Sequence, residues 1–397
     1  MEPHPTPSRA PTARLALCAG AAMLLTSCAR RVDRFTVDRV VERALSVPDV
    51  DQACQIGSGL RSPLASLGSK KRPPHQALLI AEFTAALCDE IAGWDHELRA
   101  AQAGSAALGL SPSAKVATIR DARLAADRSH TRAAARFSRA WDHGEAAFGP
   151  MGAETCPRLR EADELPYMVT LVSGLQVVLH DSAGGSTLGV PKETILDVAR
   201  AARCLDDAKW WYGPSGMQAA AWATIPGSGP EGVDPWEMLE GVAQKSDDTG
   251  IRVARALQVI IAVNAGQEDI ARAAIVAHAA ARVSTPESAQ YALFDRYALL
   301  LSRHQSDLFW IAEEGHRTPV FGELPGADAL APADDPFADD PFAVDPFSND
   351  PASRDPFADP GTEPGTEPGT EPETEPGTEP STEPATDPSP DAPPEAP

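Results

Sequence analysis

The chain has 397 residues, 43% of them hydrophobic, which is enough to build a globular body with a sizeable core. Its formal net charge is −23, yet residues 331–397 alone hold 18 acidic side chains and one base, Arg354, and so contribute −17. The rest of the chain is mildly acidic and has no basic cluster beyond residues 70–72, which excludes a nucleic-acid-binding protein and leaves no polybasic face for anionic lipid.

The first residues have the pattern of an export signal. Arg9 and Arg14 precede an apolar run over residues 15–25, and no acidic residue occurs between positions 10 and 29. A basic start, a short apolar segment and small residues at its end are typical of a secretory signal peptide, and the run is too short to span a bilayer. We predict a signal peptide over residues 1–27. The alternative is a cytosolic protein with an apolar N-terminal helix.

The residue after this segment is a cysteine. Leu25-Thr26-Ser27-Cys28 resembles the lipobox of bacterial lipoproteins. The resemblance implies that Cys28 carries a diacylglycerol and that its acyl chains hold the mature protein on a membrane surface. Ala29 follows instead of aspartate, which by the sorting behaviour of such lipoproteins implies the outer membrane, with the protein facing the periplasm.

Four cysteines remain for the body, Cys54, Cys88, Cys156 and Cys204, because Cys18 is lost with the signal. An even number in an exported chain indicates two disulfides. Sequence order favours Cys54–Cys88 and Cys156–Cys204, although three pairings are possible and four buried free thiols are the alternative. No cysteine or histidine spacing suits zinc, and we predict neither a metal nor a cofactor.

Residues 49–315 have the pattern of an α-helical body. Apolar residues recur every three or four positions, the connections are short and rich in glycine or proline, and no sustained alternation predicts a strand. Ser111-Pro112 begins one helix, and the nearly apolar residues 165–179 form a central helix buried on all sides. Other helices are expected over residues 33–45, 49–67, 78–98, 114–148 (one helix or a broken pair), 192–211, 215–224, 235–245, 251–263, 268–283 and 287–312.

Short antiparallel helix pairs predict an all-α, tetratricopeptide-like solenoid of helical hairpins, with an ordinary bundle as the alternative. Residues 266–274 resemble the start of a tetratricopeptide pair, but no clean 34-residue period occurs. Residues 28–48 are expected to be the lipidated tether and residues 316–330 a linker.

Residues 331–397 are predicted to be a disordered acidic tail. Asp-Pro-Phe recurs four times, and tetrads similar to Gly-Thr-Glu-Pro follow up to residue 388. Frequent proline and like charge prevent this segment from burying a core. It is either a spacer through the cell wall or an array of docking motifs, whose weak contacts would add through effective concentration. The docking candidates are Phe337, Phe342, Phe347 and Phe357.

Patterns of catalysis are missing from the sequence, which has no G-x-S-x-G, H-E-x-x-H or P-loop motif. Residues 227–232 fit G-x-G-x-x-G, but they follow a helical run and are interpreted as a loop. Residues 95–97 and 142–145 combine acids with histidine, yet adjacent helical residues point about 100° apart, so we interpret both as solvated helix faces. We predict no catalytic residue. An enzyme would need a titratable pair facing one pocket.

Large aromatic residues gather at Trp210, Trp211 and Tyr212, with Trp222 one helix later. Beside the Gly213-Pro214 corner they could line a groove for an apolar ligand. Packing between hairpins is the alternative.

The body, from about residue 37 to 310, resembles the T-component lipoproteins associated with TRAP transporters. The similarity rests on residues 78–86, 131–146, 165–175 and 212–236, while the acidic tail and the lack of a His/Glu pair after Gly213 depart from it. It implies a helical protein that forms a trimer, engages a periplasmic solute-binding protein and holds apolar small ligands, such as organic acids with hydrophobic parts. The sequence thus predicts a non-enzymatic accessory lipoprotein of solute uptake. A helical envelope scaffold that docks proteins through its tail is the alternative.

Overall fold

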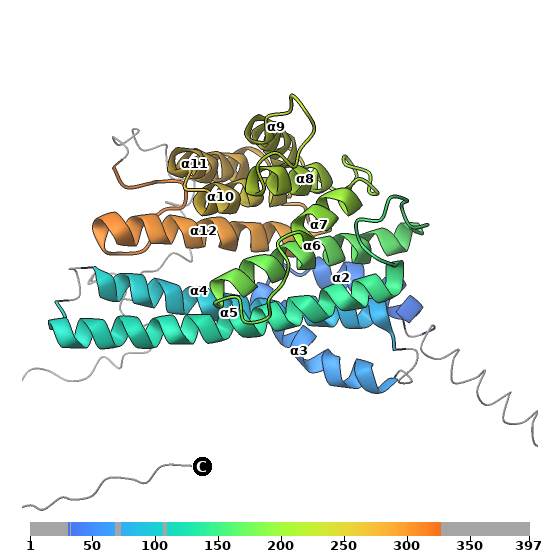
Figure 1. The fold of residues 1–397 in the computed structure, drawn as a ribbon, viewed down its shortest axis with the longest axis horizontal. Coiled ribbons are helices and arrows are strands. Elements are labelled where there is room, and N and C mark those ends of the chain that lie inside the picture. The colour runs from blue at the N-terminus through green and yellow to red at the C-terminus, as the bar shows by residue number, and fades with distance from the viewer. Residues whose placement is uncertain (1–30, 32, 68–72, 106–108, 327–397) are drawn as a thin grey trace, which may run out of the picture. The chain divides into compact units, whose positions relative to one another are not determined.

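The computed structural model describes residues 31, 33–67, 73–105 and 109–326 (Figure 1). Secondary structure in these ranges is helical apart from one isolated bridge, between Phe321 and Glu323, so the predicted all-α fold is confirmed. Cys28 and the four tail phenylalanines lie outside the described residues. The helices are η1 (Val37–Val41, a π-helix), α2 (Glu42–Leu45), α3 (Val50–Leu67), α4 (His75–Gly104), α5 (Pro112–Phe148), α6 (Glu161–Ala183), α7 (Thr194–Ala202), α8 (Gly213–Thr224), α9 (Pro235–Asp247), α10 (Val253–Asn264), α11 (Glu268–Ser284) and α12 (Ala292–Glu314).

Helices α4 and α5 form a long hairpin, with α3 packed on α4 and α6 packed on both (Figure 1). Helix α12 lies between α4 and the group formed by α8 to α11, and it contacts α4 on one side and α10 on the other. Helices α4, α6 and α12 therefore meet in the interior of the body.

The interior helices are apolar on almost every side, as predicted for residues 165–179. In α6 nearly every residue from Leu165 to Val178 is buried. Helices α5 and α6 approach closely because each presents a glycine to the other. A Cβ on Gly144 would lie 2.1 Å from Cγ2 of Thr170, and one on Gly174 would lie 2.3 Å from the Trp141 ring. Larger residues at either position would push the helices apart.

Helix α5 is one continuous helix and not a broken pair. Its N-cap is Ser111, whose Oγ accepts the backbone N–H of Ala114 at 3.4 Å, as the Ser-Pro pattern predicts. Ion pairs hold it on α4: Arg132 and Arg136 contact Asp89 at 2.9 and 3.2 Å. The alanine-rich sequence of α5 permits the close packing, and the arginines fix its register on α4.

The prediction of one helix over residues 192–211 is wrong in its second half, because α7 ends at Ala202. A turn follows in which Oδ1 of Asp206 accepts the N–H of Lys209 at 2.7 Å. Trp211 and Tyr212 then adopt positive φ angles of 54° and 59°, which no helix tolerates. Helical periodicity over residues 203–211 was therefore misleading.

Two disulfides fasten the body, and they have the pairing favoured by sequence order. Cys54–Cys88 joins α3 to α4 with a Cα–Cα distance of 5.3 Å. Cys156–Cys204 joins the segment before α6 to the turn after α7, with a Cα–Cα distance of 5.4 Å. Each disulfide links segments that are near neighbours in the sequence.

The body extends beyond both expected boundaries. Residues from 33 onward, expected to belong to a tether, pack against it: Oδ1 of Asp33 accepts the N–H of Ala77 at 3.0 Å, and Leu45 is fully buried. Residues 316–326, expected to be a linker, also pack, since Thr318 is buried and the Trp310 indole donates to the carbonyl of Glu323 at 2.9 Å. Among the described helices, none is long and apolar enough to cross a bilayer.

Candidate ligand-binding site

A cavity of about 530 Å³, called the central cavity below, lies where α4, α5, α6 and α12 meet. Its lining mixes polar side chains with apolar ones such as Leu179, Ile260 and Leu301, and a separate, nearly apolar pocket of about 40 Å³ shares these three residues with it. The cavity therefore offers both hydrogen-bonding groups and hydrocarbon to a ligand. Its polar lining includes the cation Lys192 and six further side chains, which with Tyr297 form the polar cluster: Glu90, Glu97, His130, Gln176, His180 and His304.

Helical spacing brings the polar cluster together. Helix α4 supplies Glu90 and Glu97, seven residues apart, with Trp94 between them. Side chains at such intervals share one helix face. The other pairs obey the same rule: Gln176 and His180 on α6 are four residues apart, and Tyr297 and His304 on α12 are seven apart.

Glu90 is the buried centre of the cluster, with 1% of its surface exposed. It accepts hydrogen bonds from the Tyr297 hydroxyl at 2.8 Å, from the Gln176 amide at 3.1 Å and from Nε2 of His180 at 2.9 Å. These donors offset the cost of removing a carboxylate from water. Burial, followed by the charge of Glu90, raises the pKa of Tyr297 well above its usual value, so the hydroxyl stays protonated and donates.

Glu90, His180, His130 and Glu97 form a continuous row of hydrogen bonds. His180 and His130 meet through their Nδ1 atoms at 2.9 Å, and Nε2 of each imidazole contacts a carboxylate, also at 2.9 Å. Each of the three contacts needs one hydrogen-bond donor, so the row from Glu90 to Glu97 is a single connected hydrogen-bond network.

Glu97 is the accessible acid of the cluster, with 34% of its side chain exposed. Its two oxygens accept Nε2 of His130 and Nε2 of His304, both at 2.9 Å. Burial raises the pKa of Glu97, but the two imidazole hydrogen bonds outweigh burial and lower it to about 2. Glu97 is therefore ionised at neutral pH, and Nδ1 of His304 is buried without a hydrogen-bond partner. Glu97 can therefore accept a hydrogen bond from a ligand, and Nδ1 of His304 is open to one.

A glycine makes room for the histidine pair. Gly93 lies on α4 against the imidazole of His130, and a Cβ at this position would come within 2.6 Å of the ring carbon Cε1. Any other residue would displace the ring from Glu97. The close approach of α4 and α5 at Gly93 is therefore part of how the site is built.

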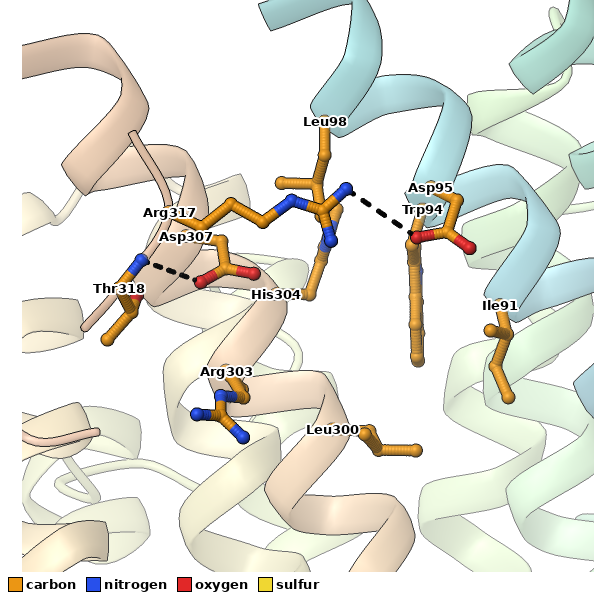
Figure 2. A pocket seen from close by; sticks show the side chains of 10 residues that line it. All are labelled: Ile91, Trp94, Asp95, Leu98, Leu300, Arg303, His304, Asp307, Arg317 and Thr318. Atoms are coloured by element: carbon orange, nitrogen blue, oxygen red, sulfur yellow. Dashed lines mark hydrogen bonds and ion pairs between the residues drawn. The ribbon is translucent and has the colours of Figure 1, made fainter. Parts of the chain in front are cut away.

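Figure 2 shows the residues that line a second pocket, whose volume is about 350 Å³. Trp94 and His304 line both this pocket and the central cavity. The two rings stack at 5.3 Å between centroids. Arg317 forms a long ion pair with Asp95 at 3.8 Å across the pocket, and Arg303 has no hydrogen-bond or ion-pair partner among the described residues (Figure 2). The lining of this pocket thus includes two arginines, Arg303 and Arg317.

The aromatic residues predicted to line a ligand groove lie elsewhere. Trp210 and Trp211 are 2% and 7% exposed and belong to the main core, where Trp211 packs on Tyr291 at 4.8 Å. Tyr212 is half-buried under the ammonium group of Lys245. These three residues line neither pocket, because the turn before α8 directs both indoles into the protein. Half-buried Trp222 packs beside Gly229 and precedes two cavity residues, Thr224 and Ile225.

Sequence reasoning missed the polar cluster. The interpretation of residues 95–97 as a solvated face is wrong for Glu97, which binds two buried histidines, although Asp95 is exposed as expected. In the second motif, Nδ1 of His143 contacts Nδ1 of His75 at 3.1 Å. The available signal was the spacing of polar residues on otherwise apolar helices, not adjacency in the sequence.

In the described part of the chain, no three His, Cys, Asp or Glu side chains are arranged so that they could hold a metal ion. Comparisons with protein-family models, with curated proteins and with solved structures found no match to this chain. The resemblance to T-component lipoproteins therefore stays a prediction.

Proposed function

We propose that this protein is an exported lipoprotein that binds a small amphipathic molecule in the central cavity. The observation that carries the proposal is a cavity of about 530 Å³ whose lining combines the polar cluster with apolar side chains such as Leu179, Ile260 and Leu301. Sites for small molecules have this size and this division between a few polar groups and an apolar lining.

The electrostatics favour a ligand that donates hydrogen bonds. Glu97 is ionised, and Nδ1 of His304 has no hydrogen-bond partner among the described residues. An amine or hydroxyl group would pair with Glu97, whereas a carboxylate placed beside Glu97 would be repelled and would have only Lys192 as a cationic partner in the lining. We therefore propose a ligand with an amine or hydroxyl head and a short hydrocarbon part.

The same groups support binding over catalysis. A titratable set does face one pocket, which is the arrangement an enzyme would need. However, a general base works best with a pKa near the working pH, and the pKa of Glu97 is about 2. Tyr297 is held protonated as well.

Titration calorimetry with hexylamine and hexanoate tests the ligand class. Hexylamine is expected to bind and hexanoate is not. Glu97→Gln should weaken hexylamine binding by about tenfold or more, the equivalent of one charge-assisted hydrogen bond of about 1.4 kcal/mol. Glu237→Gln, at an exposed position on α9, is the matched control. Unchanged affinity in Glu97→Gln would refute the proposed site.

The cellular role follows from the N-terminal pattern. The two disulfides support an oxidising compartment outside the cytosol. We propose that the acylated chain faces the periplasm and passes its ligand to, or receives it from, a periplasmic solute-binding protein, as the resemblance to TRAP T-components implies. Affinity capture from solubilised membranes should recover such a protein, and its absence would remove the transport role.

Deletion of the C-terminal tail distinguishes a scaffold role from ligand binding in the central cavity. If deletion of residues 331–397 abolishes partner capture while hexylamine binding persists, docking through the Asp-Pro-Phe motifs is the correct interpretation.

A further inference from the structure

Helix α3 carries two apolar faces, of which only one is used in packing. Val50, Cys54 and Leu64 are among the side chains that it buries against the body. Its other face is solvent-exposed, with Ile56, Leu60 and Leu67 at 41%, 40% and 54% exposure. Large apolar side chains at this exposure lose favourable burial unless something covers them.

The exposed residues form one continuous row. At 100° per residue, Ile56, Gly59, Leu60, Pro63 and Leu67 fall within a sector of about 100°. Gln52 is the only other residue in this sector, which contains no charge. The row is called the α3 stripe below. A stripe of this width is typical of a helix that rests on an apolar surface.

The polar side of α3 carries few charges. Its serines, Ser58, Ser62 and Ser66, are exposed, Asp51 is exposed in the first turn, and Arg61 is paired with Glu82 at 2.7 Å. Charge complementarity to a protein partner is therefore weak along this helix. Contact through the stripe would depend on apolar area and hydroxyl groups.

The first described residues of the chain lie close to α3. Oδ1 of Asp33 accepts the N–H of Ala77, and Ala77 packs in a small core cluster with Leu64 of α3. Cys28 precedes Asp33 by five residues, a span of at most about 18 Å when fully extended. Phe35, 63% exposed, lies two residues further on. An acylated Cys28 would therefore hold this end of α3 close to the bilayer.

We propose that the α3 stripe, together with Phe35, lies on the lipid surface that holds the acyl chains of Cys28. The inference rests on the lipoprotein part of the proposed function. The acyl chains tether the protein at one point, and the stripe provides a second contact that fixes the orientation of the body. The central cavity is then held in a defined direction relative to the membrane.

Depth-dependent quenching tests the contact directly. The acylated protein is reconstituted in phosphatidylethanolamine–phosphatidylglycerol vesicles that contain a nitroxide lipid. A fluorophore is attached through Leu60→Cys or, as the control, through Val283→Cys, an exposed position on α11. Quenching at position 60 should exceed that at position 283 by about threefold or more, because interfacial helices bury their apolar face about 5–10 Å deep. Equal quenching overturns the inference.

Two further measurements separate the possible failures. Mass spectrometry shows whether Cys28 is acylated. If Cys28 is acylated but quenching is equal at both positions, only the proposed lipid contact of the α3 stripe is refuted. If Cys28 is not acylated, the lipoprotein part of the proposed function is refuted as well. Sedimentation equilibrium in detergent compares the wild type with Ile56→Ser/Leu60→Ser. A shift from oligomer to monomer in the variant would make the stripe a subunit interface and overturn the lipid contact.

Discussion

Removal of Glu90 is expected to be among the most damaging single substitutions in this protein. Glu90→Ala leaves the Tyr297 hydroxyl, the Gln176 amide and Nε2 of His180 without their shared acceptor in a site that is 1% exposed. Each unsatisfied buried donor costs about 1–3 kcal/mol, and the costs do not simply add, so the expected loss is about 3–6 kcal/mol. That is a large part of the 5–15 kcal/mol typical of a folded domain.

Glu90→Gln refines this prediction. The amide keeps one oxygen acceptor and offers N–H groups to the Tyr297 oxygen, so only one donor remains unpaired and the expected loss is about 1–3 kcal/mol. Urea unfolding followed by circular dichroism at pH 7, with disulfides intact, measures both variants. Exposed Glu237→Ala is the control, with an expected change within about 0.5 kcal/mol. A loss below about 1 kcal/mol in Glu90→Ala, or equal losses in both variants, would contradict the hydrogen-bond argument.

The disulfide between Cys54 and Cys88 closes a loop with a sequence separation of 34, so replacing both with alanine should lower the free energy of unfolding by about 4 kcal/mol in urea titrations. Gly93→Ala should cost about 1–3 kcal/mol by the same measurement, because its Cβ would meet an imidazole ring at 2.6 Å. Gly241→Ala, on an open helical position, should instead stabilise the protein by up to about 1 kcal/mol. Acid should weaken the protein through Glu97: its pKa of about 2 in the folded state is below the ordinary 4.5, so the stability it contributes is complete above pH 4.5 and is lost as the pH falls toward 2. Glu97→Gln should flatten the decline of the free energy of unfolding within that pH interval, and an unchanged slope would contradict the assignment.

Local patterns predicted much of the fold. The periodicity of residues 165–179 identified the buried helix α6, and Ser111-Pro112 identified the start of α5. Sequence order also favoured the correct disulfides, because each joins neighbouring segments. These features depend on residues that are close in sequence, which is why the sequence reveals them.

The polar cluster could not be predicted in the same way. Glu97 lies in an acid-rich stretch of α4 that resembles a solvated helix face in the sequence. Only the folded structure shows that His130 of α5 and His304 of α12 bind its carboxylate. Conversely, the turn before α8 buries Trp210 and Trp211, residues that looked suited to a groove. In both cases the outcome depended on residues far away in the chain.

The sequence by itself determined the helical class, the start of α5 and the apolar character of α6, because helix periodicity and capping act over a few residues. The tertiary structure alone decided which polar side chains meet in the interior and which apolar residues stay exposed on α3. The reason is physical: the ionisation of Glu97, the hydrogen bond between two histidines and the burial of an indole all depend on the distance and dielectric environment between helices, and these exist only after the helices have packed.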